Sequence, residues 1–150
     1  MCAGLAVFLS VANTQAADFT ASLTGGAEVP PVATNATGSA SFTFLSVLDT
    51  ELLVTVRTNT RLSSRVTGAH IHTGAVGVAG PIVLDFSNGS IVNTAILGIN
   101  INSAAHLSGS LAGQTLSDLR ELMTTGDTYI NVHTSTNPSG EIRGQIELAD

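Results

Sequence analysis

The 150-residue sequence contains no lysine and no tryptophan, and its eleven acidic residues outnumber its five arginines. The resulting formal net charge of −6 would repel a DNA or RNA phosphate backbone, so we exclude nucleic acid as a partner. Cys2 is the only cysteine, so no disulfide can form within the chain. The longest apolar run is shorter than the roughly 20 residues that a transmembrane helix needs, so we predict no membrane span.

The N-terminal segment, residues 1–17, has the composition of a secretory signal. An apolar stretch from Ala3 to Ala12 is followed by small and polar residues before Asp18. This order is typical of the hydrophobic region and the cleavage end of an export signal. We therefore expect residues 18–150 to form one domain that is secreted, periplasmic or at the cell surface. The alternative is an ordered N-terminal strand or helix that packs on this domain.

Aromatic residues make up only 4% of the chain, which instead has 15 glycines and many serines, threonines and asparagines. This composition is typical of short strands joined by turns, and the length is that of one domain with one core. We predict an all-β, antiparallel fold. Period-two alternation and turn residues place its strands at 19–24, 38–47, 51–58, 66–72, 81–86, 129–134 and 141–148, with weaker strand character over 91–101. In the last strand we expect Ile142, Ile146 and Leu148 to face the core.

One short helix is also predicted, beginning after Thr115. Asp118 stands three residues later, as in a capping box, and Gly126 can end the helix. Apolar residues recur at helical spacing between them, and we expect these to pack on the sheet: Leu116, Leu119, Leu122 and Met123.

Three of the four histidines lie in two predicted strands, as the pair His70 and His72 and as His133. Alternate residues of a strand share a face, so the pair has Cα atoms roughly 6–7 Å apart. Neutral imidazole is the commonest metal ligand among side chains, and a neighbouring strand could supply the third nitrogen of a copper or zinc site. In the alternative interpretation the histidines are hydrogen-bonded residues of a polar sheet face, or brace loops through Asn131 and Thr134.

Other polar residues near these strands could support the ligands, namely Glu28, Asn131, Thr134, Glu141 and Arg143. For Glu28 and Glu141 we favour surface salt bridges over a place in the metal shell. Glycines at every third position of residues 74–80 predict a tight loop whose backbone passes close to the histidines. His106 lies in a polar run, and we expect it to be a solvated loop residue.

Four ordered blocks of the sequence resemble the CHRD domain, which is named for the repeats of the animal protein chordin. The blocks are Glu28–Pro31, Gly68–Gly74 running into Gly80–Val83, Tyr129–Thr134 and Pro138–Ile146. The resemblance covers about residues 18–148 and implies an extracellular, immunoglobulin-like β-sandwich. The His-x-His strand and the glycine-rich loop are also loosely similar to copper, zinc superoxide dismutase. This chain has neither a further histidine-rich loop for zinc nor a cysteine pair, which argues against dismutase activity.

Three functional hypotheses follow from these features. The first is an exported binding module that holds a copper or zinc ion through His70, His72 and His133. The second is a structural or adhesive extracellular module that self-assembles, or binds an extracellular protein, through unpaired strand edges. The third is a small redox metalloenzyme, which we rank last because no sequence feature demonstrates a substrate pocket beside an open coordination position.

Overall fold

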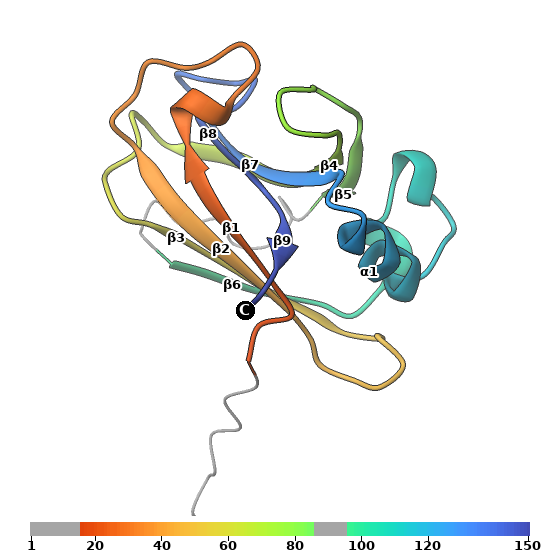
Figure 1. Cartoon of the computed structure of the whole chain (residues 1–150). Helices are drawn as coiled ribbons and strands as arrows, with labels where there is room; N and C mark the ends of the chain where they lie inside the picture. Colours follow the sequence, from red (N-terminus) through yellow and green to blue (C-terminus); the bar gives the residue numbers. More distant parts are fainter. Residues whose placement is uncertain (1–15, 86–95) are drawn as a thin grey trace, which may run out of the picture.

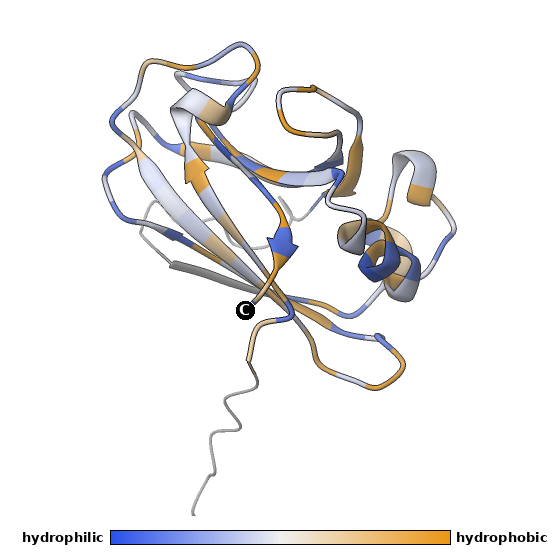
Figure 2. Cartoon of the chain, viewed as in Figure 1, coloured by the Kyte–Doolittle hydropathy of each residue, from blue (hydrophilic) through white to orange (hydrophobic). Residues whose placement is uncertain are grey.

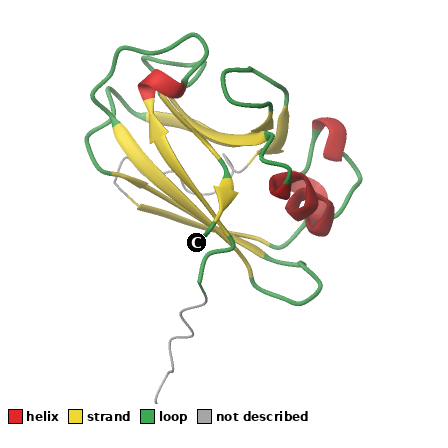
Figure 3. Cartoon of the chain, viewed as in Figure 1, coloured by secondary structure: helices red, strands yellow, loops and turns green. Residues whose placement is uncertain are grey.

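The computed structural model describes residues 16–85 and 96–150 (Figures 1 and 3). Its strands are β1 (Phe19–Thr24), β2 (Thr37–Phe44), β3 (Leu52–Thr58), β4 (Val66–Thr73), β5 (Ile82–Asp85), β6 (Ile96–Ile101), β7 (Thr128–Thr134), β8 (Ile142–Gln145) and β9 (Glu147–Leu148). The α-helix among the described residues is α1 (Leu116–Thr124), and three short 3-10 turns are formed by Gly25–Ala27, Ala104–His106 and Gly109–Leu111. The predicted all-β class with one short helix is confirmed. Most of the predicted signal segment and the start of the predicted 91–101 strand lie outside the described residues.

All nine strands belong to one antiparallel sheet, in the order β5-β4-β7-β8-β1-β2-β3-β6, and β9 pairs with β1. The two halves of the sheet are joined narrowly, because β8 and β1 share the single residue pair Thr24–Arg143. The sheet therefore curls, and the β5-β4-β7-β8 half faces the β1-β2-β3-β6 half (Figure 1). The predicted sandwich takes the form of one sheet folded over its own core.

Apolar and polar residues alternate along the strands (Figure 2), and the apolar side chains form the core inside the curled sheet. Phe19, Phe42 and Ile71 are at most 1% exposed. Helix α1 lies beside the sheet and adds three buried residues to this core, Leu116, Leu119 and Met123. Its predicted capping box is present, with reciprocal hydrogen bonds between Thr115 and Asp118. In the described part of the chain, no helix has the length and hydropathy needed to span a bilayer.

The C-terminal strand differs from its prediction. Instead of one strand over 141–148, β8 pairs with β7 and β9 pairs with β1. Ile146, between them, is fully buried, but Leu148 is 63% exposed, so the prediction that Leu148 faces the core was wrong. The chain changes its partner strand at Ile146, which ends the alternation on which that prediction depended.

Candidate metal centre

The three sequence-predicted histidines converge on the outer face of the sheet. His70 and His72 lie on β4 and His133 lies on the adjacent strand β7, where the register pairs Gly68 with His133 and His70 with Asn131. One nitrogen atom from each imidazole lies within 4.8 Å of the other two. The predicted three-histidine cluster is therefore present in the structure.

Backbone carbonyl groups select the tautomer of two of the rings. His72 Nδ1 lies 2.9 Å from the carbonyl oxygen of Gly80, and His133 Nδ1 lies 2.9 Å from that of Pro138. Because a carbonyl oxygen only accepts, each Nδ1 carries the proton and each Nε2 keeps a lone pair. The Nε2 atom of His72 is buried and has no hydrogen-bond partner among the described residues. Two imidazole lone pairs are thus available to one site.

His70 lies between two hydrogen-bond acceptors. Its Nδ1 atom is 2.9 Å from His133 Nε2, and its Nε2 atom is 3.5 Å from Asp85 Oδ1. The contact with Asp85 arises because the β4–β5 register places the two residues opposite each other. A neutral imidazole has only one N–H, so it can donate to one of these two acceptors but not to both.

Burial lowers the pKa of all three histidines, because desolvation disfavours the imidazolium form. For His70, repulsion from His133 adds to desolvation, and the two outweigh the attraction of Asp85, which leaves the pKa at about 4. Desolvation also prevails at His72 and His133, although their bonds to the Gly80 and Pro138 carbonyl groups raise the pKa. The three imidazoles are therefore neutral at pH 7, which is the form that coordinates metal ions.

The side chains of Tyr129 and Arg143 tie the 74–80 loop to the cluster. Tyr129 stacks on His72 with the ring centroids 4.8 Å apart and an interplanar angle of 9°, and its hydroxyl group accepts a hydrogen bond from the Gly80 N–H. The Arg143 guanidinium lies 3.3 Å from the Tyr129 ring centroid and donates to two carbonyl groups of the loop. The loop backbone passes beside the histidines, as its glycine spacing predicted.

Glu28 and Asn131 form a buried polar pair at Gly140. Glu28 is 6% exposed and Asn131 is 3% exposed. A Cβ atom on Gly140 would overlap Glu28 Oε1 and lie 2.8 Å from Asn131 Nδ2, so both side chains reach the same point. Desolvation raises the pKa of Glu28 to about 7, against the lowering effect of the Arg143 charge. The predicted surface salt bridge was wrong for Glu28, which is buried and forms no salt bridge within the described residues.

Glu141 also differs from its prediction, because its side chain is fully buried. The carboxylate accepts hydrogen bonds from the backbone and hydroxyl of Ser63 and from the hydroxyls of Thr34 and Thr134. Burial raises the pKa of Glu141, but these hydrogen bonds together outweigh burial and leave the pKa below its ordinary value. Glu141 therefore joins three separate segments of the chain, which contain Thr34, Ser63 and Thr134.

Sequence reasoning did not single out Asp85 or Tyr129 as parts of the site. Asp85 is the polar residue at the end of the otherwise apolar strand β5. That contrast was the only local feature of the sequence that could have indicated it. Tyr129 is the only tyrosine and precedes His133 by four residues, so alternation placed it on the same face without indicating its stacking on His72. His106 lies in the Ala104–His106 turn and outside the cluster, as predicted.

Comparison with known proteins identifies one family. The CHRD domain matches residues 19–146, which include every residue of the histidine cluster and its surroundings. No curated protein and no solved structure matches the chain.

Proposed function

Because the chain belongs to the CHRD-domain family, whose members are typically extracellular, we propose that it is an exported binding module that holds one copper or zinc ion. The ligands in this proposal are His70 Nδ1, His72 Nε2 and His133 Nε2. These are the nitrogen atoms that the surrounding acceptors leave available for coordination.

The proposal depends mainly on His70, whose neutral ring has one N–H group but faces two hydrogen-bond acceptors. Its ring faces His133 Nε2 on one side and the Asp85 carboxylate on the other, with one N–H to offer. An ion bound at Nδ1 replaces the proton there and leaves Nε2–H to donate to Asp85. A carboxylate that accepts from a ligating histidine is the common way in which proteins orient such a ligand.

The spacing of the nitrogen atoms is compatible with a tetrahedral ion. Metal–nitrogen bonds of 2.0–2.1 Å at a tetrahedral angle separate the ligand atoms by about 3.3 Å. The 2.9 Å between His70 Nδ1 and His133 Nε2 is slightly shorter, and one nitrogen atom of each ring lies within 4.8 Å of those of the other two. Three imidazoles suit Zn²⁺ and Cu²⁺, and Cu²⁺ binds nitrogen sites more tightly than Zn²⁺ does.

We assign supporting roles to five buried polar residues around the ligands. Asn131 lies beside His72, and Arg143 acts on the same ring through Tyr129. Thr134 and Glu141 hold the segments that surround β7. Glu28 and Asn131 both approach Gly140, in the turn that follows His133.

Metal titration with a histidine control tests the proposal. Chelator-stripped protein is titrated with Zn²⁺ and Cu²⁺, and the bound metal is counted by elemental analysis after dialysis. We expect one ion per chain, with affinity reduced more than about 100-fold in His72→Ala, because losing a ligand costs more than losing an outer partner. His106→Ala, which changes a histidine outside the cluster, leaves both values unchanged.

Spectroscopy adds a readout that does not depend on stoichiometry. Electron paramagnetic resonance of the Cu²⁺-loaded protein should show three nitrogen donors, and two in His133→Ala. Circular dichroism of each variant verifies that the sheet is retained. Equal metal content in the parent protein and in a His70→Ala/His72→Ala double variant would disprove the proposal.

A further inference from the structure

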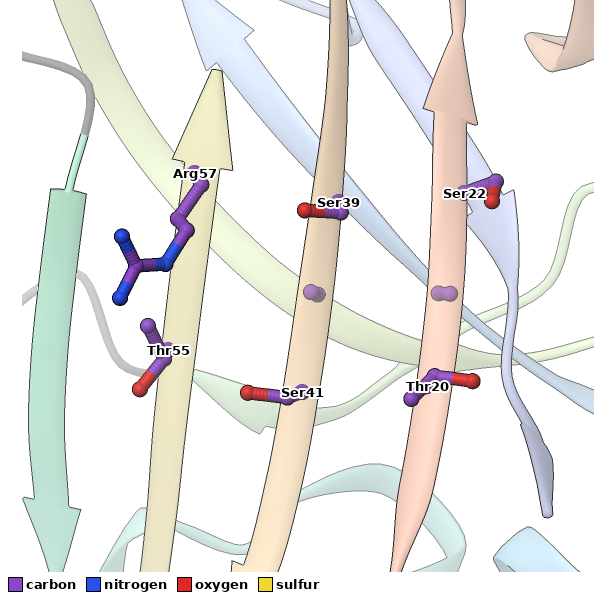
Figure 4. A pocket seen from close by; sticks show the side chains of 8 residues that line it. Thr20, Ser22, Ser39, Ser41, Thr55 and Arg57 are labelled. Carbon is purple, nitrogen blue, oxygen red and sulfur yellow. The ribbon is translucent and has the colours of Figure 1, made fainter. Parts of the chain in front are cut away.

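The outer face of β1, β2 and β3, on the other half of the sheet, contains a shallow depression (Figure 4). Its volume is about 310 Å³, at the lower end of the range of ligand sites. Six polar side chains line it: Thr20, Ser22, Ser39, Ser41, Thr55 and Arg57. Within the described chain, none of these six side chains forms a hydrogen bond or an ion pair. The depression therefore presents unused hydrogen-bonding groups to solvent.

Strand register arranges these side chains in two rows. Each row crosses three strands that lie about 4.8 Å apart, and the rows are Ser22–Ser39–Arg57 and Thr20–Ser41–Thr55. The depression exists because every residue on this part of the face except Arg57 has a short side chain. In Figure 4 the hydroxyl groups of Ser39 and Ser41 point toward β3, where Thr55 and Arg57 lie. The face is thus a regular grid of hydroxyl groups with a cation at one side.

The chemistry of this grid excludes several classes of ligand. No aromatic or large apolar side chain lines the depression, so it offers nothing to stack on a flat ring or to bury a lipid chain. The backbone groups of β1, β2 and β3 are paired in the sheet, so a peptide cannot add to this face as a strand. Each serine or threonine hydroxyl both donates and accepts, which complements a ligand rich in hydroxyl groups.

Arg57 sets the charge of the ligand. A guanidinium group pairs with a carboxylate through two parallel hydrogen bonds, and Arg57 is exposed at the edge of the depression. The net charge of −6 opposes a densely charged polyanion such as nucleic acid. The complement of this surface is therefore a chain with many hydroxyl groups and carboxylates, at a lower charge density than duplex DNA.

We propose that the outer face of β1, β2 and β3 binds an acidic polysaccharide, with Arg57 pairing with a uronate carboxylate and the neighbouring hydroxyl groups bonding to sugar hydroxyls. Each hydroxyl contact replaces a contact with water, so the affinity for a short oligosaccharide is modest, with a dissociation constant on the order of 1 mM. This proposal concerns a different face from the metal site and does not depend on it.

The test follows the amide resonances of the ¹⁵N-labelled, metal-free protein during titration with tetragalacturonate. We expect saturable shifts confined to β1, β2 and β3, and at least about tenfold weaker binding of neutral maltotetraose, because bonds to a charged group are the stronger ones. Arg57→Gln should weaken tetragalacturonate binding about tenfold. Arg65→Gln, which changes an exposed arginine that does not line the depression, should leave it unchanged.

A second variant tests the depression without changing charge. Ser39→Leu fills the centre of the grid with an apolar side chain, and should abolish the β1–β3 shifts while the remaining spectrum shows an intact fold. His72→Ala should bind tetragalacturonate as the parent protein does, which separates this proposal from the metal site. The proposal is overturned by the absence of saturable shifts up to about 10 mM ligand, by equal binding of maltotetraose, or by equal weakening in Arg65→Gln.

Discussion

The two halves of the curled sheet have the same alternation of apolar and polar residues, yet their outer faces differ. On β1, β2 and β3 most outer residues, such as Ser22 and Ser39, are exposed or half-buried. On β4, β7 and β8 the outer residues His72, Asn131 and Arg143 are at most 9% exposed. The difference arises from the connections, because the 74–80 loop and the turn around Gly140 lie over the second face only. Most polar groups of a covered face must find partners within the protein, and burial lowers the pKa of the histidines there.

The largest expected difference between the two faces is the response to metal. Under the proposed function, Zn²⁺ at a free concentration a thousandfold above its dissociation constant raises the free energy of unfolding by about 4 kcal/mol, because it binds only the folded state. Urea denaturation with and without Zn²⁺ measures this change. Ser39→Leu on the open face should retain the full increase, and His72→Ala should lose it. An equal increase in His72→Ala would place the ion elsewhere.

The next largest effect concerns the loop that covers the histidines. A Cβ atom on Gly80 would overlap the carbonyl oxygen of Thr73 in β4, so Gly80→Ala must push the loop off the sheet. We expect a loss of about 3 kcal/mol in unfolding free energy and weaker metal binding, because the Gly80 carbonyl group orients His72.

Gly77→Ala is the matched control in the same loop. Nothing lies within 4 Å of its added Cβ, and only its φ of +78° is unfavourable, which costs about 1 kcal/mol. Thermal unfolding of both variants, with metal affinity measured alongside, makes the comparison. Similar losses in the two variants would mean that close packing of the loop does not hold it in place.

A third prediction concerns the pH dependence of the unfolding free energy, whose direction follows from the raised pKa of Glu28. The pKa of this residue is raised from 4.5 to about 7 in the folded state, so its contribution to stability is complete below pH 4.5 and is lost as the pH rises through 7. Glu28→Gln should therefore increase the unfolding free energy by about 2 kcal/mol at pH 7.5 and change it little at pH 4.5. Glu147→Gln, at an exposed position of β9, should show no such pH dependence.

The histidines of the covered face change the unfolding free energy with pH in the direction opposite to that of Glu28. The folded-state pKa of His70 is lowered from 6.5 to about 4, so its contribution is complete above pH 6.5 and is lost as the pH falls toward 4. Removing the opposing effect of Glu28 should make stability fall more steeply with acid over this range. Denaturant titrations at half-unit pH steps measure both slopes, and a parallel pH profile for Glu28→Gln and the parent protein would contradict the burial of that carboxyl.

The smallest effect compares a threonine buried at the end of β7 with a half-buried threonine on the open outer face of β3. Thr134 is fully buried, donates to Glu141 and accepts from the Asn137 N–H. Thr134→Val keeps the shape but leaves these groups without a partner, so it should cost about 1.5 kcal/mol. Thr55→Val, on the open face, should stay within about 0.5 kcal/mol of the parent protein. Equal midpoints of urea denaturation for the two variants would mean that the buried hydrogen bonds of Thr134 have no energetic consequence.

Much of the fold could be predicted from local sequence. Alternation identified Phe19, Ala21 and Leu23 as a buried row of β1, and Thr115 with Asp118 marked the start of α1. These features depend on backbone geometry and on residues a few positions apart, which a sequence displays directly. The same logic placed His70 and His72 on one face.

Only the tertiary structure decided which polar residues are buried and which ligands meet. Glu28 and Glu141 have the local pattern of surface residues, yet segments distant in sequence cover both of them. His133 joins His70 because β7 lies beside β4, and Asp85 joins because β5 lies on the other side of β4. Strand order depends on how the whole sheet closes over its core, and that closure is a property of contacts between distant residues. The sequence by itself therefore determined the strands, the helix and the paired histidines, and the folded sheet alone determined that they form a site.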